Sequence, residues 1–373
     1  MTSNSLLSRS ANERFFHPEL DVLRFFAFFF IFIHHSMPHD PAAYTAMGVS
    51  PALAAILSAI GAAGAFGVPL FFLLSAYLVT ELLIRERALR GRVDLKAFYL
   101  RRSLRIFPLY FFFLVFAWAL QWLIPGQHIG WRAALAFTFL VGNWWVVFVG
   151  FPSSVIFPLW FVSLQEQFYL VWPGLMRKLS ARGLILAPVA MLVVATLTRW
   201  YLGTQHTWES RVWANTFVQL DGIAFGILFA VLLAGSYFVI KGDPLTTTRL
   251  LLGYPVAAIG AAALFLATLR PTVTYSAADR AAWPPPTRIF RSWLLPALAY
   301  LGQISFGLYV FHIIGLMTSD YAVQHQASSL GRYLFRNSVA FAVTIILAAL
   351  SYRWLESPFL NLKKRFSQVP SRT

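Results

Sequence analysis

The sequence predicts an all-α integral membrane protein, a bundle of about ten transmembrane helices, and three observations support this fold class. Apolar residues make up 58% of the 373 positions, only 12% are charged, and the mean hydropathy is +0.65. Soluble domains carry about twice that share of charge. The charges also leave membrane-sized gaps, because only Asp40 and Glu81 occur between Arg24 and Arg85. Finally, 36 Phe, 14 Tyr and 13 Trp are typical of a lipid-facing surface with aromatic belts.

The composition also excludes several classes of site. The chain has no cysteine, which rules out disulfides, thiolate metal sites and a cysteine nucleophile. The net charge of +16 does not indicate nucleic acid, because the basic residues stand at the ends of apolar segments instead of alternating with aromatic residues on a polar surface. We therefore expect membrane lipid as a partner, no nucleic acid and no metal.

Ten runs near twenty residues, each bounded by charge, Pro or Gly, predict the individual spans. The predicted spans are residues 20–37, 62–84, 106–124, 132–149, 159–176, 184–202, 214–236, 250–269, 293–317 and 334–356.

The first run lacks a small-residue cleavage site, so we expect a retained helix and not a removed signal peptide. No repeat or separate soluble segment is visible. We predict one transmembrane domain over 1–373, with an N-terminal segment at 1–19, the bundle at 20–358 and a tail at 359–373.

The loops predict the orientation. Residues 85–105 hold eight basic side chains and residues 38–61 hold none, so the 85–105 loop is expected in the cytoplasm. With ten spans both termini are then cytoplasmic, in a multi-pass protein of the bacterial inner membrane. Arg177, Lys178 and Arg182 fall on the outer side in this count, against the charge rule. A re-entrant 131–158 segment is the alternative, and it would place the C-terminus outside; we retain ten spans.

The first span carries two polar residues at membrane depth, where an ionisable group is costly. Arg24 and His35 are eleven residues apart, which is within about 20° of three helical turns, so both face one side of the helix about 16 Å apart. His34 points about 100° aside. The alternative is that Arg24 and His35 extend to the two membrane interfaces.

The basic loop ends in a pair of arginines. Arg102 and Arg105 stand at i and i+3 before an aromatic span, so in a helix they converge on one phosphate or pyrophosphate. Plain positive-inside charge and contact with lipid head groups is the other interpretation.

Glu166 is the sole acid between Arg132 and Arg177. A lone carboxylate in lipid needs a partner, so we expect it to face the bundle interior, either as the structural partner of an arginine or as a member of a site. For Asp221 and His312, which also lie in apolar spans, interhelical hydrogen bonds are the favoured interpretation.

Six segments together resemble the acyltransferase-3 family of membrane acyltransferases, over most of the chain. Asp21, Leu23 and Arg24, followed after ten residues by His35, are similar to the family's opening. GAFGVPLFFLLSAYLVT resembles its Gly-Val-x-x-Phe-Phe-x-x-Ser segment, and FYLRRSLRIFPLYF resembles its Arg-x-x-Arg loop. LWFVSLQEQFYLVWP, LGQISFGLYVFH and SYRWLESPF complete the order. Three positions depart from the family pattern: Pro69, Ala76 and Gln165.

The resemblance implies transfer of an acyl group, commonly acetyl from acetyl-CoA, to a hydroxyl of a cell-envelope or exported glycan. Histidine has an unperturbed pKa of about 6.5, which suits a general base, and His35 matches the family's histidine. Arg102 and Arg105 are expected to hold the CoA phosphates, while Arg24 guides the pantetheine arm or stabilises charge on the carbonyl oxygen. Arg24 and Glu166 are thus expected to join His35 in catalysis.

A transporter or flippase for a lipid-linked or small polar substrate is the alternative from a different class. It also needs about ten spans with scattered polar residues. The sequence shows no inverted repeat with paired broken helices, which is the feature that favours such a protein.

Overall fold

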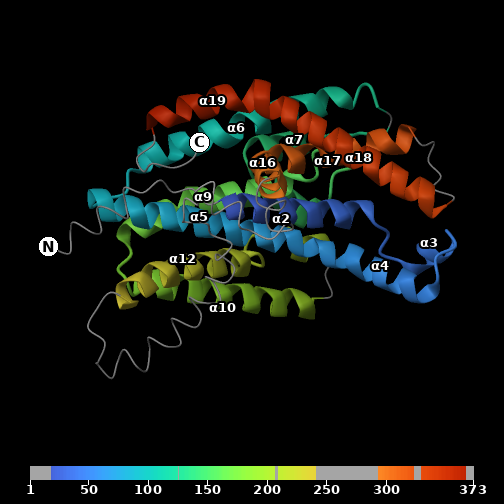
Figure 1. Ribbon diagram of the computed structural model, residues 1–373. Helices are drawn as coiled ribbons and strands as arrows, with labels where there is room; N and C mark the ends of the chain where they lie inside the picture. The colour runs from blue at the N-terminus through green and yellow to red at the C-terminus, as the bar shows by residue number, and fades with distance from the viewer. Residues whose placement is uncertain (1–17, 125, 206–208, 241–292, 323–328, 367–373) are drawn as a thin grey trace, which may run out of the picture.

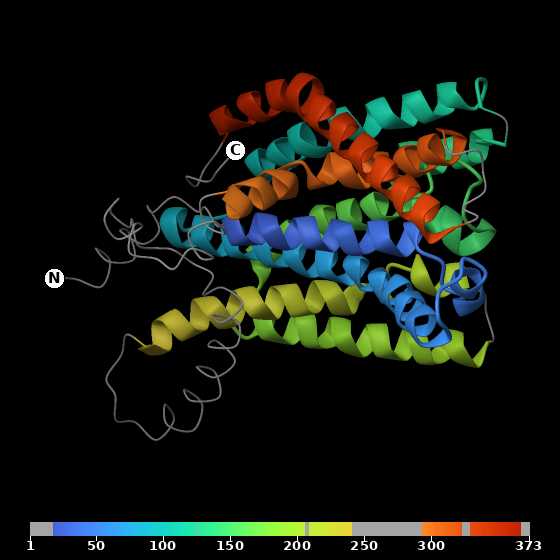
Figure 2. The same ribbon diagram turned by 45° about the vertical axis from the view of Figure 1, so that its right-hand side comes forward.

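A computed structural model describes residues 18–124, 126–205, 209–240, 293–322 and 329–366. These residues form helices and turns, without any strand among them. Most of the helices lie side by side and run between the same two ends of an elongated bundle (Figures 1 and 2). The predicted span 250–269 lies outside the described residues.

The helices are bounded as follows. In chain order they are α2 (Pro18–Ser36), α3 (Pro41–Thr45), α4 (Pro51–Ala63), a 3-10 turn (Gly64–Phe66), α5 (Gly67–Arg90), α6 (Leu95–Leu120), α7 (Trp131–Thr138), α8 (Gly142–Val149), α9 (Leu159–Lys178), α10 (Gly183–Thr204), α11 (Glu209–Trp213), α12 (Leu220–Ile240), α16 (Leu295–Gln303), α17 (Ser305–Ala322), α18 (Leu330–Ser351), a π-helical turn (Tyr352–Glu356), α19 (Ser357–Lys363) and a last 3-10 turn (Lys364–Phe366).

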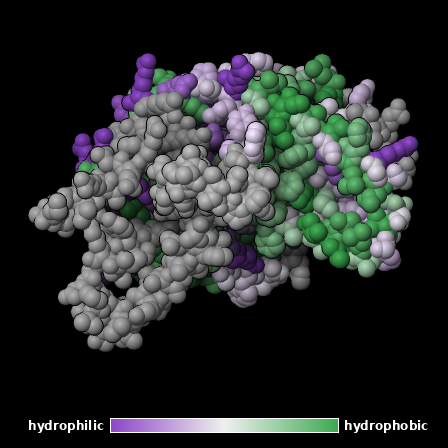
Figure 3. All heavy atoms as spheres, in the orientation of Figure 1, coloured by the Kyte–Doolittle hydropathy of each residue, from purple (hydrophilic) through white to green (hydrophobic). Residues whose placement is uncertain are grey.

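The described part of the chain has the helices of an integral membrane protein. Four stretches are long and apolar enough to cross a membrane, namely Pro51–Arg90, Leu95–Leu120, Gly183–Thr204 and Leu330–Lys363. The pair α16 and α17, bent by 78°, is a fifth if it is taken as one span. Figure 3 shows hydrophobic side chains over much of the visible surface, as a lipid-facing protein requires.

The integral membrane class is therefore confirmed, whereas the count of ten spans is not. One reason is that α2 and α9 are largely interior helices. They face other helices, so they need not be apolar all round, and they carry the charged and amide side chains that the sequence places at membrane depth. The outer helix α10 shows the opposite pattern, since Leu186, Val193 and Leu197 on it are exposed.

The predicted span 132–149 is wrong as a plain span. This segment forms two eight-residue helices, α7 and α8, broken at Leu140, whose φ of 58° is left-handed. His128 N–H donates to the carbonyl of Ser153 at 3.1 Å, so the segment returns to the place where it left the bundle. The re-entrant alternative describes it correctly.

Side chains from neighbouring helices satisfy the backbone at this break. The Tyr110 hydroxyl donates to the carbonyl of Phe137 at 2.6 Å, and Gln167 Nε2 donates to the carbonyl of Leu140 at 3.1 Å. Irregular backbone is tolerated at membrane depth only when it is buried in protein in this way. Sequence periodicity misses the break because those partners lie on α6 and α9.

The break also changes the placement of the loops. Arg87 Nη1 donates to the carbonyl of Leu179 at 2.9 Å, so the loop after α9 lies at the same end as residues 85–105. The expectation that Arg177, Lys178 and Arg182 lie on the opposite side is wrong. Arg101 Nη1 donates to the carbonyl of Phe366 at 2.9 Å, which brings the end of the described C-terminal segment there too. The re-entrant alternative is therefore right about the path of 131–158 but wrong in expecting the end of the chain on the opposite side.

This placement predicts the result of a labelling experiment. The chain has no native cysteine, so single cysteines can be read without background. Arg92→Cys and Arg182→Cys, both at exposed positions, should react with a membrane-impermeant thiol reagent from one side, and Thr45→Cys from the other. Labelling of positions 92 and 182 from opposite sides would restore the plain span at 132–149.

A close approach between α2 and α16 sets the geometry of the interior. A Cβ at Gly302 would collide with the backbone of Asp21, so only glycine allows α16 to cross α2 at this point. The chain then bends at Ile304, and α17 starts inside the bundle. Ser305 is thereby placed across from Arg24, which stands one turn after Asp21 on α2.

Candidate functional site

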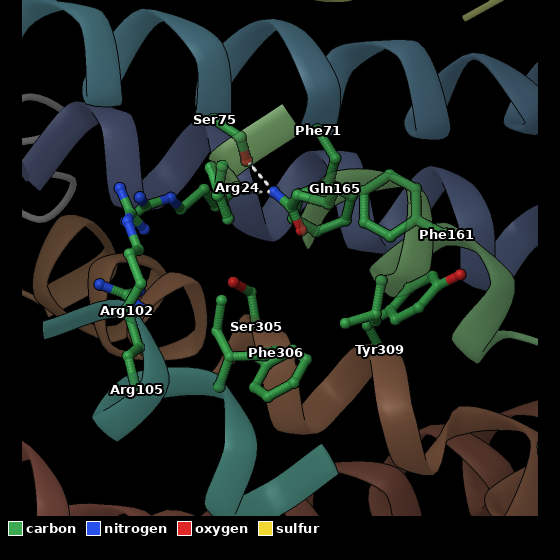
Figure 4. A pocket seen from close by; sticks show the side chains of 13 residues that line it. Arg24, Phe71, Ser75, Arg102, Arg105, Phe161, Gln165, Ser305, Phe306 and Tyr309 are labelled. Atoms are coloured by element: carbon green, nitrogen blue, oxygen red, sulfur yellow. Dashed lines mark hydrogen bonds between the residues drawn. The ribbon is translucent and has the colours of Figure 1, made fainter. Parts of the chain in front are cut away.

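A cavity of about 550 Å³, measured with its open mouth, lies between five helices (Figure 4). Its lining consists of a cationic, a polar and an aromatic group of side chains. The lining residues are Arg24 from α2; Phe71 and Ser75 from α5; Arg102, Arg105 and Ile106 from α6; Phe161, Val162, Gln165 and Tyr169 from α9; and Ser305, Phe306 and Tyr309 from α17.

Three arginines form the cationic end of this cavity. Arg102 and Arg105 both line it, as their i, i+3 spacing predicts, and Arg24 joins them from α2. Arg24 Nη1 donates to Asp21 Oδ1 at 3.0 Å, and the Arg102 guanidinium lies 4.4 Å from the centre of the Tyr169 ring. None of the described residues that line the cavity carries a carboxylate. An excess of fixed guanidinium charge at the mouth of a cavity favours a phosphorylated ligand.

Amide and hydroxyl groups form the middle of the cavity. Gln165 Nε2 donates to Tyr169 Oη at 2.8 Å and also to Ser75 Oγ. Figure 4 shows Ser305 across from these residues, with its hydroxyl directed into the cavity. Gln165 and Ser75 belong to two of the segments that carry the family resemblance, and the structure brings them into contact.

Three aromatic rings close the far end. The ring centres of Phe161 and Tyr309 are 5.2 Å apart, those of Phe71 and Phe161 are 5.8 Å apart, and those of Phe71 and Tyr309 are 6.2 Å apart. The Tyr309 hydroxyl donates to the carbonyl of Pro158 at 2.7 Å, which holds its ring in place. The Tyr309 ring also lies next to the ring of His312, with the two centres 5.7 Å apart.

The histidine pair joins the first span to a residue 277 positions later. His35 Nδ1 lies 2.9 Å from His312 Nε2, and the two rings stack with their centres 5.0 Å apart. His312 is fully buried and its Nδ1 lies 2.6 Å from the carbonyl of Tyr309, whereas His35 is exposed. His35 is not among the residues that line the arginine cavity.

These contacts assign the tautomers of both rings. A backbone carbonyl only accepts, so His312 Nδ1 carries a proton that it donates to Tyr309. In a neutral His312 the Nε2 atom is then an acceptor, and His35 Nδ1 must donate to it. His35 Nε2 is consequently left as the atom with a free lone pair. An imidazole oriented through its other nitrogen has the arrangement of a general base.

The adjacent histidine has a different environment. His34 Nδ1 lies 3.1 Å from the carbonyl of Gly61, and its ring stacks on that of His39 with centres 4.5 Å apart. It thus points away from His312, as the helical geometry predicts.

Glu166 is buried in the bundle interior, within electrostatic range of Arg102. Its Oε1 has no hydrogen-bond partner among the described residues, and Glu166 does not line the cavity. The structure therefore places this predicted catalytic residue beside the cationic end and describes no contact between it and His35. The expected role as the partner of an arginine is compatible with this position, and the catalytic role of Glu166 stays a prediction.

The two remaining polar residues differ from each other. Asp221 Oδ2 accepts from Arg199 Nη1 at 2.6 Å, which is the interhelical bond expected for it. His312 also makes the interhelical hydrogen bond expected for it, but its partner is another histidine, His35. No spacing pattern links positions 277 residues apart, and the only sequence signal was its occurrence in a polar stretch of an apolar span. In the described ranges, no three His, Cys, Asp or Glu side chains are grouped to hold a metal ion.

Comparison with known proteins gives a consistent family. The sequence pattern of the family described as "Acyltransferase domain" matches residues 17–353. The O-acetyltransferase OatA of Staphylococcus aureus (strain NCTC 8325 / PS 47) is 25% identical over an alignment 393 residues long, gaps included, which covers 95% of this chain and 59% of OatA. SAR0937 of Staphylococcus aureus (strain MRSA252), whose name qualifies its O-acetyltransferase activity as inferred, is 26% identical over 82% of this chain and 55% of its own length. The chain thus spans little more than half the length of these curated relatives, and no solved structure matches it.

Proposed function

The chain belongs to the acyltransferase domain family, and we propose that it transfers an acyl group, of the acetyl type, from acyl-CoA to a hydroxyl of a cell-envelope or exported glycan. One observation carries the proposal: Tyr309 lines the arginine cavity, and its backbone carbonyl accepts from His312, the partner of His35, so the cavity and the histidine base meet at one residue. The S. aureus relatives are named as O-acetyltransferases, which supports an oxygen acceptor.

Arg102 and Arg105 would bind the phosphates of the donor. Arg24 stands beside them at the cationic end, about 16 Å along α2 from His35. This position favours a contact with phosphate, since charge on the thioester oxygen would develop near the histidine. Glu166 would support Arg102 as a buried counter-charge.

The chemical step would use His35 Nε2. The acceptor hydroxyl oxygen attacks the thioester carbonyl carbon, the carbon–sulfur bond breaks, and the hydroxyl proton passes to His35 Nε2 and from there to the leaving CoA sulfur. His312 keeps the Nδ1–H tautomer of His35 by accepting from it, and Tyr309 fixes His312 in turn. The acyl end of the donor must reach past Tyr309 for this step.

A variant pair separates orientation from packing at His312. Gln retains an acceptor for His35, whereas Phe fills similar space without one. We expect His312→Phe to lower kcat by about 10²-fold through misplacement of the base, and His312→Gln to recover part of that loss, with the KM for donor little changed in both. Equal kcat values in the two variants, measured with labelled acetyl-CoA, would show that His312 acts through packing alone.

The location follows the same proposal. We place the end that carries residues 85–105 in the cytoplasm, where acyl-CoA is available, and the protein in a bacterial inner membrane.

One observation favours the transporter alternative, because α7/α8 and α16/α17 are broken helices of the kind that transporters use. The family match does not favour it.

The acceptor is tested by supplying the purified protein with labelled acetyl-CoA and a panel of envelope glycans. Label on a glycan hydroxyl is expected. Failure of every glycan to accept label, while another hydroxyl compound does, would overturn the glycan assignment and leave acyl transfer standing.

A further inference from the structure

The cavity is organised in layers one helical turn apart. On α5, Phe71 is followed at i+4 by Ser75; on α9, Phe161 is followed by Gln165; and on α17, Ser305 is followed by Tyr309. Residues four apart share a helix face and lie about 6 Å apart along the axis. Three helices therefore contribute one side chain each to the aromatic wall and one each to a polar layer of Ser75, Gln165 and Ser305, with the arginines beyond.

Ser305 has an incomplete set of hydrogen bonds. It is only 5% exposed and lines the cavity, yet its hydroxyl has no hydrogen-bond partner among the described residues. Figure 4 shows its oxygen directed into the cavity, between the arginines and Gln165. Because this hydroxyl opens on the cavity and makes no hydrogen bond to another described residue, a polar group bound in the cavity can serve as its partner.

The start of α17 strengthens this position. Ser305 is the first residue of an 18-residue helix, and the N–H groups of a first turn have no partner within their own helix. The bend of 78° after α16 turns this helix end toward the bundle interior. The site thus presents donors and a partial positive charge beside the Ser305 hydroxyl.

Gln165 offers the complementary group. Its Nε2 donates hydrogen bonds to the hydroxyls of Ser75 and Tyr169, which leaves the amide oxygen as the acceptor on the cavity side. A donor on one wall and an acceptor on the opposite wall match the C=O and N–H of a secondary amide.

We propose that Ser305 and Gln165 form an amide-binding subsite for the pantetheine arm of an acyl-CoA donor. The inference rests on the proposed function and extends it to a part of the donor that the arginines do not contact. The order of the layers supports this ligand class, because phosphates, amide linkages and an apolar thioester follow one another in acyl-CoA as the cationic, polar and aromatic layers do in the cavity. The subsite would give ligands that contain the pantetheine arm a higher affinity than nucleotides that lack it.

The test compares two ligands on the full-length protein in detergent. Acetyl-CoA has the arm, and 3′-phosphoadenosine 5′-diphosphate has the phosphates without it. We expect Ser305→Ala to weaken acetyl-CoA binding by about three- to tenfold and to leave the nucleotide affinity unchanged. Gln165→Leu should act in the same direction. Ser338→Ala is the matched control, since Ser338 is an exposed serine on α18 whose hydroxyl donates to the carbonyl of Leu334.

Each outcome has a separate meaning. Unchanged acetyl-CoA affinity in Ser305→Ala, or an equal loss for both ligands, overturns the subsite while the proposed function stands. If the wild-type protein binds no acetyl-CoA, the proposed function fails and the subsite fails with it.

Discussion

His35→Ala should lower acyl-transfer turnover by about 10²- to 10⁴-fold, because it removes the group that accepts the hydroxyl proton. The hydrogen bond between His35 Nδ1 and His312 Nε2 leaves His35 Nε2 with a free lone pair that can accept this proton. Turnover is measured as label transferred from acetyl-CoA per protein. His34→Ala is the matched control, since His34 contacts the carbonyl of Gly61 instead of His312, and this variant should lose far less activity.

The His35 variant must also be shown to be folded. It should remain monodisperse in detergent and bind CoA as the wild type does, because His35 does not line the arginine cavity. A folded, CoA-binding His35→Ala protein with near wild-type turnover would remove His35 from the mechanism and leave His312 as the histidine to examine.

Arg102→Ala together with Arg105→Ala should weaken CoA binding by about 10²- to 10⁴-fold. Each change removes a charge-assisted contact of about 1.5 to 3 kcal/mol with a phosphate, and every 1.4 kcal/mol corresponds to a factor of ten. Lysine at both positions should restore binding only in part, because an ammonium group lacks the planar fork of guanidinium. Isothermal titration with CoA measures the effect.

The control for this pair lies in the same basic loop. Arg92 is exposed and does not line the cavity, so Arg92→Ala should leave CoA binding within about twofold of wild type. Equal losses in Arg92→Ala and in the double variant would mean that the whole basic face attracts CoA without a defined site.

Local patterns in the sequence predicted the parts of the structure that one helix determines. Arg24 and His35 lie on a single continuous helix, and the i, i+3 spacing of Arg102 and Arg105 brings both to one cavity. The turn of His34 away from His35 also follows from helical geometry alone. These features need no knowledge of neighbouring helices.

Features that depend on contacts between distant segments were not predictable. The backbone at the break near Leu140 is hydrogen-bonded by Tyr110 and Gln167, so nothing within 131–158 marks its position, and only the loop charges indicated that the segment could be re-entrant. The bend before Ser305 depends on the close approach of Gly302 to the backbone of Asp21. The contact between His35 and His312 joins residues that are 277 positions apart. Hydrophobic periodicity records burial along one helix and carries no information about which helix covers it.

Sided acyl transfer in proteoliposomes distinguishes an acyltransferase from a transporter. Labelled acetyl-CoA is supplied only to vesicles that expose the 85–105 loop, with the best glycan acceptor of the panel inside them. We expect label to become covalently attached to the acceptor with wild-type protein and to be lost in the Arg102→Ala, Arg105→Ala variant. Release of free CoA should match the label transferred. Movement of an intact substrate across the bilayer, with no new ester and no release of CoA, would overturn the proposed function and identify a transporter.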